Sequence, residues 1–267
     1  MRSSIKSAAN PKIKLAISLH QKKHREKAGM FLVEGIRMVE MAIRSGWEIE
    51  YGFFTMEAAR ESRVAAALLD LDPVCNMYEV STLLLQRIGE TQTPQGIVLV
   101  VKFGATEVDM KTILGKEKPL LVALESVQDP GNVGTIIRTA DAVGADGVVL
   151  LGNSVDPFCS KALRATMGSI FHVPVITALT KGDFLRELDA YGIPLFAAAI
   201  DMSAGTFFHQ DFSEASAIIF GNEANGLSDD ILARSKSIYI PMQGHAESFN
   251  VAVAAGIIMY EAFRQRL

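Results

Sequence analysis

The chain has 267 residues, of which 49% are hydrophobic and 21% charged, with a net charge of −4. This composition is typical of a globular protein, and the length suffices for one large domain or two smaller ones. Charges or turn residues interrupt every apolar run before the roughly 18 residues that a membrane span needs, and the N-terminus lacks the apolar core of a signal peptide. Cys75 and Cys159 are too few for a disulfide framework or a cysteine zinc site. We therefore expect a cytoplasmic protein without a membrane partner.

The charges are unevenly distributed. Residues 1–27 contain eight basic side chains against one acid, Glu26, whereas the rest of the chain carries 18 basic and 29 acidic residues. A basic arm on an acidic body can bind phosphates. From charge alone, a solvated helix face is an equally good interpretation. The basic residues are Arg2, Lys6, Lys12, Lys14, Lys22, Lys23, Arg25 and Lys27.

Residues 1–105 are predicted to form a small α/β domain. Helical patterns at about 10–26, 35–45, 57–69 and 81–89 alternate with strand-like runs at 30–33, 50–54 and 97–102. Turn residues at Gly104, Gly115 and Pro119, with the charges between them, then predict a linker over 106–118.

Residues 119–267 alternate regularly between buried strands and helices. The predicted strands are 120–124, 147–151, 173–176, 194–199, 217–220 and 237–240, and the predicted helices are 132–143, 156–165, 181–190, 228–235 and 250–264. Such alternation predicts an α/β domain with a mainly parallel sheet covered on both faces. Common nucleotide signatures do not fit: no G-x-G-x-x-G follows a strand, and Leu227 stands where a P-loop spacing from Gly221 requires lysine.

Three motifs in this second domain carry functional information. They are Asp129–Arg138 (DPGNVGTIIR), Phe220–Leu227 (FGNEANGL) and Ile238–Ala254 (IYIPMQGHAESFNVAVA). The last is a strand, a polar loop and a helix start, where exposed main-chain groups can hold a small polar ligand. In this order the motifs resemble the three signatures of the SpoU (TrmH-like) RNA ribose 2′-O-methyltransferases of the SPOUT superfamily. Phe249 stands where that family usually has leucine.

Two further segments extend the resemblance to nearly the whole chain. Lys161–Ser169 (KALRATMGS) is similar to the family's K-x-x-R-A-S-x-G helix, with Thr166 in place of serine. Two segments of the first domain, Phe31–Gly35 and Thr93–Ile97, are similar to the substrate-binding domain that is often fused to the family's catalytic domain. That substrate-binding domain has the fold of kink-turn-binding ribosomal proteins. The resemblance implies a deep trefoil knot in the C-terminal domain, S-adenosylmethionine as cofactor without a metal, and a homodimer whose active sites both subunits complete.

The implied function is methyl transfer from S-adenosylmethionine to a ribose 2′-hydroxyl of structured RNA, with 23S-type ribosomal RNA preferred over transfer RNA. A SPOUT base methyltransferase and a non-catalytic RNA-binding or ribosome assembly factor are the alternatives. A base methyltransferase would not need the Asn, Arg and Ser-Asn residues found in these motifs. Because those residues are all present, a non-catalytic factor is also disfavoured. The resemblance assigns catalytic roles to Arg138, Asn132, Glu223, Ser248 and Asn250.

These residues also have structural interpretations. Asn132, Ser248 and Asn250 could simply cap helices, and Glu223 could be a solvated acid. By the resemblance, Asn132 orients Arg138 and Glu223, and Glu223 pairs with Arg138 or Asn132. The matching arginine of the family activates the ribose hydroxyl, but a guanidinium with a pKa above about 12 is a poor base. We expect Arg138 to hold the ribose and its phosphate and to stabilise the forming alkoxide.

The cofactor is expected to contact mainly main-chain groups, at Ala199, Gly221, Gly226, Ile240, Met242 and Phe249. The residues expected to bind RNA are Lys12, Lys14, Lys22, Lys23, Arg25 and Arg164. His20 and His24 have the i, i+4 spacing of a metal pair, but without a third ligand we favour a basic helix facing RNA.

Overall fold

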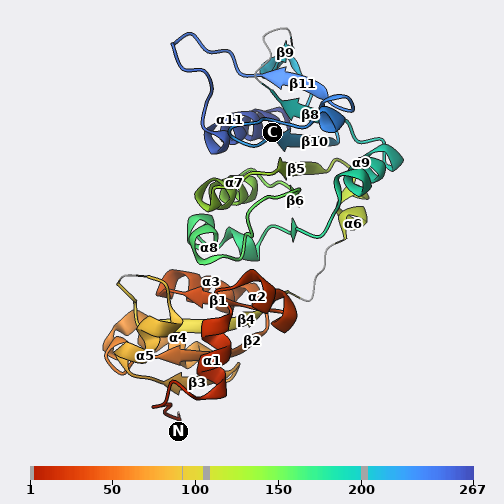
Figure 1. Ribbon diagram of the computed structural model, residues 1–267. Coiled ribbons are helices and arrows are strands. Elements are labelled where there is room, and N and C mark those ends of the chain that lie inside the picture. Colours follow the sequence, from red (N-terminus) through yellow and green to blue (C-terminus); the bar gives the residue numbers. More distant parts are fainter. Residues whose placement is uncertain (1–2, 92, 105–108, 200–203) are drawn as a thin grey trace. The chain divides into compact units, whose positions relative to one another are not determined.

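The computed structural model describes residues 3–91, 93–104, 109–199 and 204–267. The chain divides into two compact units, each built on its own sheet (Figure 1). The first unit comprises Met1–Thr106 and Phe158–Phe171, and the second comprises Glu107–Pro157 and His172–Leu267. The segment 158–171 therefore groups with the first unit, although the sequence analysis assigned it to the C-terminal domain.

The first unit has a four-stranded sheet in the order β1–β4–β2–β3. Strand β4 is antiparallel to β1 and β2, whereas β2 and β3 are parallel. One core of this unit joins Ile13, Leu85 and Ile88 to Phe53 and Val98 of the sheet. The elements are α1 (Pro11–Ser18), α2 (Lys22–Ala28), β1 (Met30–Glu34), α3 (Ile36–Ser45), β2 (Ile49–Phe54), η1 (Ala58–Arg60), α4 (Ser62–Leu71), β3 (Asn76–Glu79), α5 (Thr82–Ile88), β4 (Ile97–Lys102), α8 (Ser160–Thr166) and η2 (Ser169–Phe171).

The helix predicted over residues 10–26 is in fact two helices, α1 and α2. The chain turns between them, and Arg25 Nη1 donates hydrogen bonds to the carbonyls of Leu19 and His20 at 2.7 and 2.8 Å. Strand β3 was not predicted. Only Met77 of its four side chains is buried, so the sequence has no alternating pattern there.

The second unit has a seven-stranded sheet in the order β7–β6–β5–β10–β8–β11–β9, and every pair of neighbours is parallel. This confirms the predicted parallel sheet. All side chains of β5, β6 and β10 are buried, as expected for strands covered on both faces. The strands are β5 (Leu120–Glu125), β6 (Gly147–Leu151), β7 (Val175–Ile176), β8 (Leu195–Ala198), β9 (Gly205–Thr206), β10 (Ser216–Phe220) and β11 (Lys236–Tyr239).

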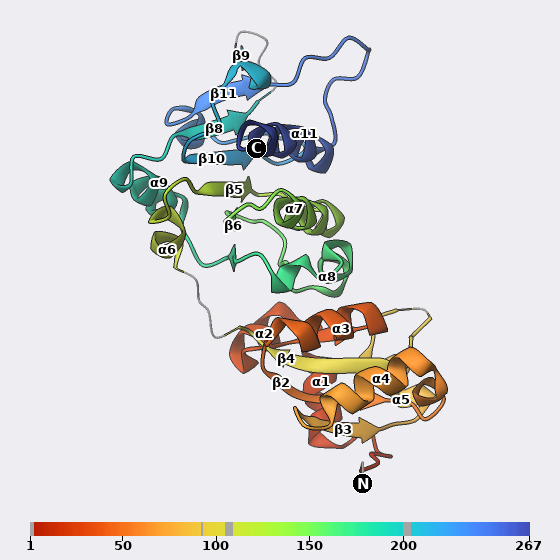
Figure 2. The same cartoon turned by 180° about the vertical axis from the view of Figure 1, so that it is seen from behind.

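Helices cover both faces of this sheet (Figure 2). Helices α7 (Pro130–Ala142) and α11 (Val251–Gln265) pack against each other on one face. Helices α6 (Met110–Leu114) and α9 (Lys181–Ala190) lie on the other, where Met110 and Phe184 join the core with Leu121 and Ala123. The remaining helices of the described part are η3 (Phe207–His209) and α10 (Asp229–Leu232). Helix α6 occupies part of the segment 106–118 predicted as a linker, of which 106–108 lie outside the described residues.

Candidate active site

The site lies where neighbouring parallel strands end. Ala199, Gly221 and Ile240 directly follow β8, β10 and β11, which are adjacent in the sheet. Because these strands are parallel, their carboxyl ends share one edge, which is where open α/β sheets bind ligands. The structure thus brings three of the six residues predicted to contact the cofactor to one edge. Gly226 lies in the loop after β10, and Met242 and Phe249 lie in the exposed segment 241–250.

The loop after β10 closes on itself. Asn222 N donates to Gly226 O at 3.0 Å, and Gly226 N donates to Asn222 O at 2.9 Å. Gly226 has φ of +67°, in the left-handed region that favours glycine. A Cβ atom on Gly221 would lie 2.5 Å from Gly226 O and 2.7 Å from Leu227 N. The close approach of the two backbone segments therefore requires glycine at position 221.

Asn222 fastens this loop to the loop after β5. Its Oδ1 accepts hydrogen bonds from Ala224 N and Asn225 N at 2.9 and 3.0 Å, and its Nδ2 donates to Ser126 O at 2.8 Å. Ser126 has φ of +57°, which is rare for a residue other than glycine. No role was predicted for Asn222 from the sequence, although asparagine in a glycine-flanked loop commonly bonds to nearby backbone.

Three of the predicted catalytic residues form one chain of hydrogen bonds. Asn132 Nδ2 donates to Glu223 Oε1 at 2.8 Å, and Asn250 Nδ2 donates to Asn132 Oδ1 at 3.1 Å. Of the two partners predicted for Glu223, the structure therefore has Asn132. We call Asn132, Glu223 and Asn250 the amide–carboxylate cluster. It joins one residue from each of the three motifs.

The helix caps explain how these side chains are placed. Asp129 caps α7, with Oδ1 accepting from Asn132 N at 2.9 Å, so the interpretation of Asn132 as the cap is wrong. Pro130 at the first helical position favours this start. Asn132 is therefore free to use both ends of its amide in the cluster. Asn250 does cap α11, since its Oδ1 accepts from Ala252 N and Val253 N at 2.9 and 3.3 Å.

Arg138 and Ser248 are exposed. Arg138 lies six residues after Asn132 on α7, which at about 3.6 residues per turn places it roughly a third of a turn away around the helix axis. Arg138 therefore projects from a different side of α7. Ser248 lies two residues before the cap of α11, in the exposed segment 241–250.

A buried acid that the sequence analysis missed supports the same edge. Glu125, the last residue of β5, is 4% exposed. Its carboxylate accepts from Ser228 N at 2.8 Å and from Ser228 Oγ at 2.6 Å, and it pairs with Lys181 Nζ at 3.0 Å. Burial alone would raise the pKa of Glu125, but the hydrogen bonds from Ser228 and Lys181 hold that pKa below its usual value. An acid ending the apolar run LLVAL was the available signal.

The residues predicted to bind RNA differ in exposure. Lys14, Lys22, Lys23 and Arg164 are exposed. Lys12 Nζ lies 4.4 Å from the ring centroid of Tyr51. Arg25 is 4% exposed, and its guanidinium bonds to the α1–α2 turn, so the exposed basic surface rests on the other residues.

The described residues offer neither a metal site nor a membrane-spanning helix. Within the described ranges, no three His, Cys, Asp or Glu side chains are grouped so that they could hold a metal ion. His20 Nδ1 instead lies 3.1 Å from Glu90 Oε1, and His24 Nδ1 lies 3.2 Å from Ser18 O. No helix among these residues has the length and apolar character needed to cross a bilayer.

The chain is similar to known protein families and to individual proteins over most of its length. Residues 119–260 match the SpoU rRNA Methylase family, and residues 10–99 match the MRM3-like substrate binding domain. The 23S rRNA (guanosine(2553)-2′-O)-methyltransferase RlmP of Bacillus subtilis is 37% identical, over 96% of this chain and 97% of that protein. The 23S rRNA (uridine(2479)-2′-O)-methyltransferase of Streptomyces viridochromogenes is 32% identical, over 93% and 88%. The AdoMet-bound rRNA methyltransferase of Sinorhizobium meliloti superposes with a TM-score of 0.88 at 33% identity, over 99% and 98%.

Proposed function

The chain belongs to the SpoU rRNA Methylase family, and on that premise we propose that it transfers a methyl group from S-adenosylmethionine to a ribose 2′-hydroxyl of 23S-type ribosomal RNA. The observation that carries the proposal is the amide–carboxylate cluster of Asn132, Glu223 and Asn250. The two 23S rRNA 2′-O-methyltransferases cited above support it, because each aligns over most of its own length. We also propose that the protein acts in the cytoplasm, because its proposed substrate, ribosomal RNA, is found there.

The residues at the sheet edge fit S-adenosylmethionine. Ala199, Gly221 and Ile240 offer main-chain groups at the ends of three adjacent strands. Met242 and Phe249 are 37% and 41% exposed, so they offer apolar surface that an adenosyl group can cover. When bound there, the cofactor supplies a methyl carbon carried on a cationic sulfur.

The side chains of the site have separate roles in methyl transfer. Methyl transfer is an in-line displacement, so the 2′-oxygen must be held close to the methyl carbon. Arg138 binds the ribose and the neighbouring phosphate and stabilises negative charge as it develops on that oxygen, since a guanidinium stays protonated. Glu223 is held by Asn132, which is held by Asn250, so the three orient the floor of the site. Ser248 contributes a hydroxyl from the exposed loop.

We further propose a homodimer in which both subunits complete each active site, and the trefoil knot of the SPOUT fold in the second unit. Arg138 projects from a different side of α7 than the Asn132 side chain, which suits an arginine supplied to the other subunit's site. Val253 and Tyr260 on α11 are 49% and 61% exposed and lie seven residues apart, on the same side of the helix. A second copy of the chain would cover this apolar surface.

The test is identification of the product. Purified protein is incubated with S-adenosylmethionine carrying a labelled methyl group and with transcribed 23S ribosomal RNA, and the RNA is hydrolysed with alkali. A 2′-O-methyl group blocks cleavage of the next phosphodiester, so the label should appear in alkali-stable dinucleotides. Asn132→Ala should abolish the label, whereas the matched control Asn153→Ala, an exposed asparagine in the loop after β6, should retain it. Label recovered in a methylated base would overturn the proposal.

A further inference from the structure

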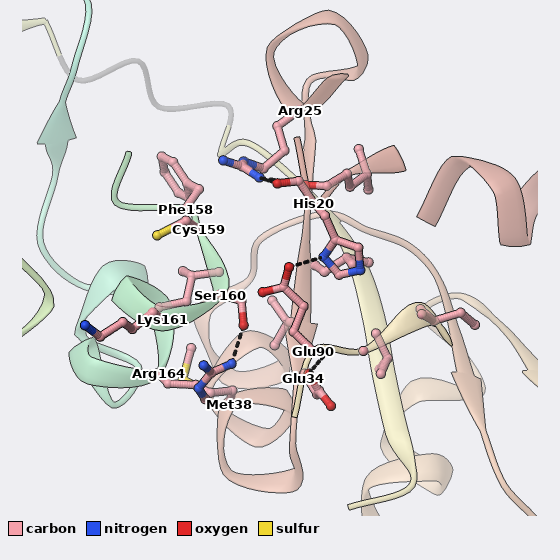
Figure 3. A pocket seen from close by; sticks show the side chains of 17 residues that line it. His20, Arg25, Glu34, Met38, Glu90, Phe158, Cys159, Ser160, Lys161 and Arg164 are labelled. Carbon is pink, nitrogen blue, oxygen red and sulfur yellow. Dashed lines mark hydrogen bonds and ion pairs between the residues drawn. The ribbon is translucent and has the colours of Figure 1, made fainter. Parts of the chain in front are cut away.

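We propose that the first unit contains a binding pocket for one unpaired nucleobase of the substrate RNA. The inference rests on the proposed function, which makes RNA the substrate, and it adds a site outside the residues assigned to catalysis. The pocket is a cavity of about 200 Å³ bounded by the α1–α2 turn, β1, the end of α5 and helix α8 (Figure 3). All of its lining residues belong to the first unit.

The size and the floor of the cavity suit a single flat ring. Its apolar lining includes Leu19, Leu32, Ile88, Val98 and Leu163. Pockets that hold drug-sized ligands have volumes of about 300–1,000 Å³, so this smaller cavity accommodates one ring system rather than a chain of them. A nucleobase buries its faces against apolar side chains and keeps its polar groups at the edge, which requires hydrogen-bonding partners at the rim.

The rim provides such partners. His20 Nδ1 and Glu90 Oε1 lie 3.1 Å apart, and the Glu90 side chain is 45% exposed. Glu34 lines the same wall, and its Oε2 accepts from Glu90 N at 3.0 Å and from Thr91 N at 3.3 Å, so it holds the backbone that carries Glu90. The exposed Glu90 carboxylate can accept hydrogen bonds from the N–H groups on a base edge, and the apolar floor suits the ring rather than a phosphate. The occupant that fits is therefore the base itself.

Cationic side chains of α8 also line the cavity, at the exposed edge where they can reach the flanking phosphates. Lys161 and Arg164 are exposed on α8, and Figure 3 shows Lys161 extending away from the His20–Glu90 pair. Lys22 and Lys23, both exposed, begin α2 directly after the turn that contains His20. Basic residues on two sides of a base-sized cavity match a single strand whose backbone passes over the rim. Because paired bases are stacked within a helix, the pocket requires an unpaired nucleotide.

Cys159 makes the pocket directly testable. It is a half-buried free thiol that lines the cavity, and the only other cysteine, Cys75, lies elsewhere in the first unit. Burial raises the pKa of the Cys75 thiol to about 11, so Cys75 should react slowly with alkylating reagents. The rate at which N-ethylmaleimide alkylates Cys159 can be measured in the full-length Cys75→Ala variant by mass spectrometry, with no need for methyl transfer.

The probes are a ten-nucleotide single-stranded oligoadenylate, an abasic oligomer of the same length, and AMP. At a saturating concentration we expect the oligoadenylate to slow alkylation of Cys159 by at least about tenfold and the abasic oligomer by less than about twofold. Equal protection by the abasic oligomer, or no protection by an oligoadenylate that binds, would overturn the proposal. Full protection by AMP at the same concentration would overturn the assignment to RNA and indicate a site for free nucleotides.

The converse experiment blocks the cavity and measures affinity for the oligoadenylate. Alkylation of Cys159 in the Cys75→Ala variant should weaken binding by roughly tenfold. The matched control is a Cys159→Ala variant treated with the reagent under the same conditions, which should bind as before the treatment, and equal effects on the two variants would overturn the proposal. The pocket and the proposed function can fail independently. If the protein methylates 2′-hydroxyls but RNA does not protect Cys159, the pocket alone is refuted. If RNA protects Cys159 but no 2′-hydroxyl is methylated, the proposed function alone is refuted.

Discussion

Replacing Gly221 by alanine tests whether the cofactor binds at the end of β10. The new Cβ would lie 2.5 Å from Gly226 O and 2.7 Å from Leu227 N, whereas ordinary contacts are 3.4–4 Å. The backbone of the 222–226 turn must therefore move by about 1 Å, and overpacking of this kind costs ~1–3 kcal/mol of stability. The same shift displaces Glu223 and the main-chain groups proposed to hold S-adenosylmethionine. We expect the dissociation constant to rise at least about tenfold and turnover to fall by about two orders of magnitude.

The matched control is Gly182→Ala in the first turn of α9. A Cβ there would lie 3.6 Å from Arg186 Nη1 and 4.0 Å from Thr180 Oγ1, which are ordinary contacts. Alanine in a helix is favoured over glycine by up to ~1 kcal/mol, so this variant should bind the cofactor normally and melt no lower than the unmodified protein. Calorimetric titration and thermal unfolding measure both quantities. A lowered melting temperature with unchanged affinity in Gly221→Ala would refute this location of the cofactor site.

Three further predictions concern charged residues. Arg138→Ala should reduce turnover by orders of magnitude and change cofactor affinity by less than ~1 kcal/mol, because the interaction of Arg138 develops in the transition state. A single-turnover assay measures this loss. Near-normal turnover would mean that Arg138 is only a surface charge. Because the pKa of Glu125 is lowered in the folded protein, its ionised form stabilises the fold above the ordinary carboxyl range near pH 4. That stabilisation should be lost as the pH falls through the lowered pKa. The free energy of unfolding, measured in urea, should therefore fall less between pH 7 and pH 3 for Glu125→Gln than for the unmodified protein. Equal losses in the two proteins would contradict this role of Glu125. Replacing Lys14, Lys22 and Lys23 by Gln should weaken RNA binding and reduce the slope of log affinity against log salt by about 0.7–0.9 per lost phosphate contact, whereas identical slopes would exclude these contacts.

The sheet of the second unit could be predicted because its strands are uniformly apolar and separated by helical patterns. Elements with weak patterns could not be predicted. Strand β9 has only two residues, Gly205–Thr206, and α6 is a single short helix within polar turn residues. The start of α7 was assigned to the wrong residue, because Asp129 and Asn132 are both good caps. Pro130 could have decided between them, since proline is favoured at the first helical position.

Residues for a candidate site could be named from the sequence, but the geometry that joins them could not. Asn132 and Glu223 are 91 positions apart, and Asn132 and Asn250 are 118 apart, so only the strand order brings them together. Glu125 and Asn222 act through backbone atoms of distant segments, which no local pattern reveals. The side of α7 on which Arg138 lies could be predicted from the sequence. On a helix, the six-residue spacing from Asn132 fixes the angle between the two side chains around the helix axis.

The central claim is that this chain methylates a ribose 2′-hydroxyl of ribosomal RNA by means of the residues at this sheet edge. The most direct measurement maps 2′-O-methyl positions across all RNA from cells with the gene, without it, and with Arg138→Ala in its place. We predict a position in 23S-type ribosomal RNA that is methylated only when the unmodified gene is present. An unchanged 2′-O-methyl map in the cells that lack the gene, or a lost mark confined to transfer RNA, would contradict the account.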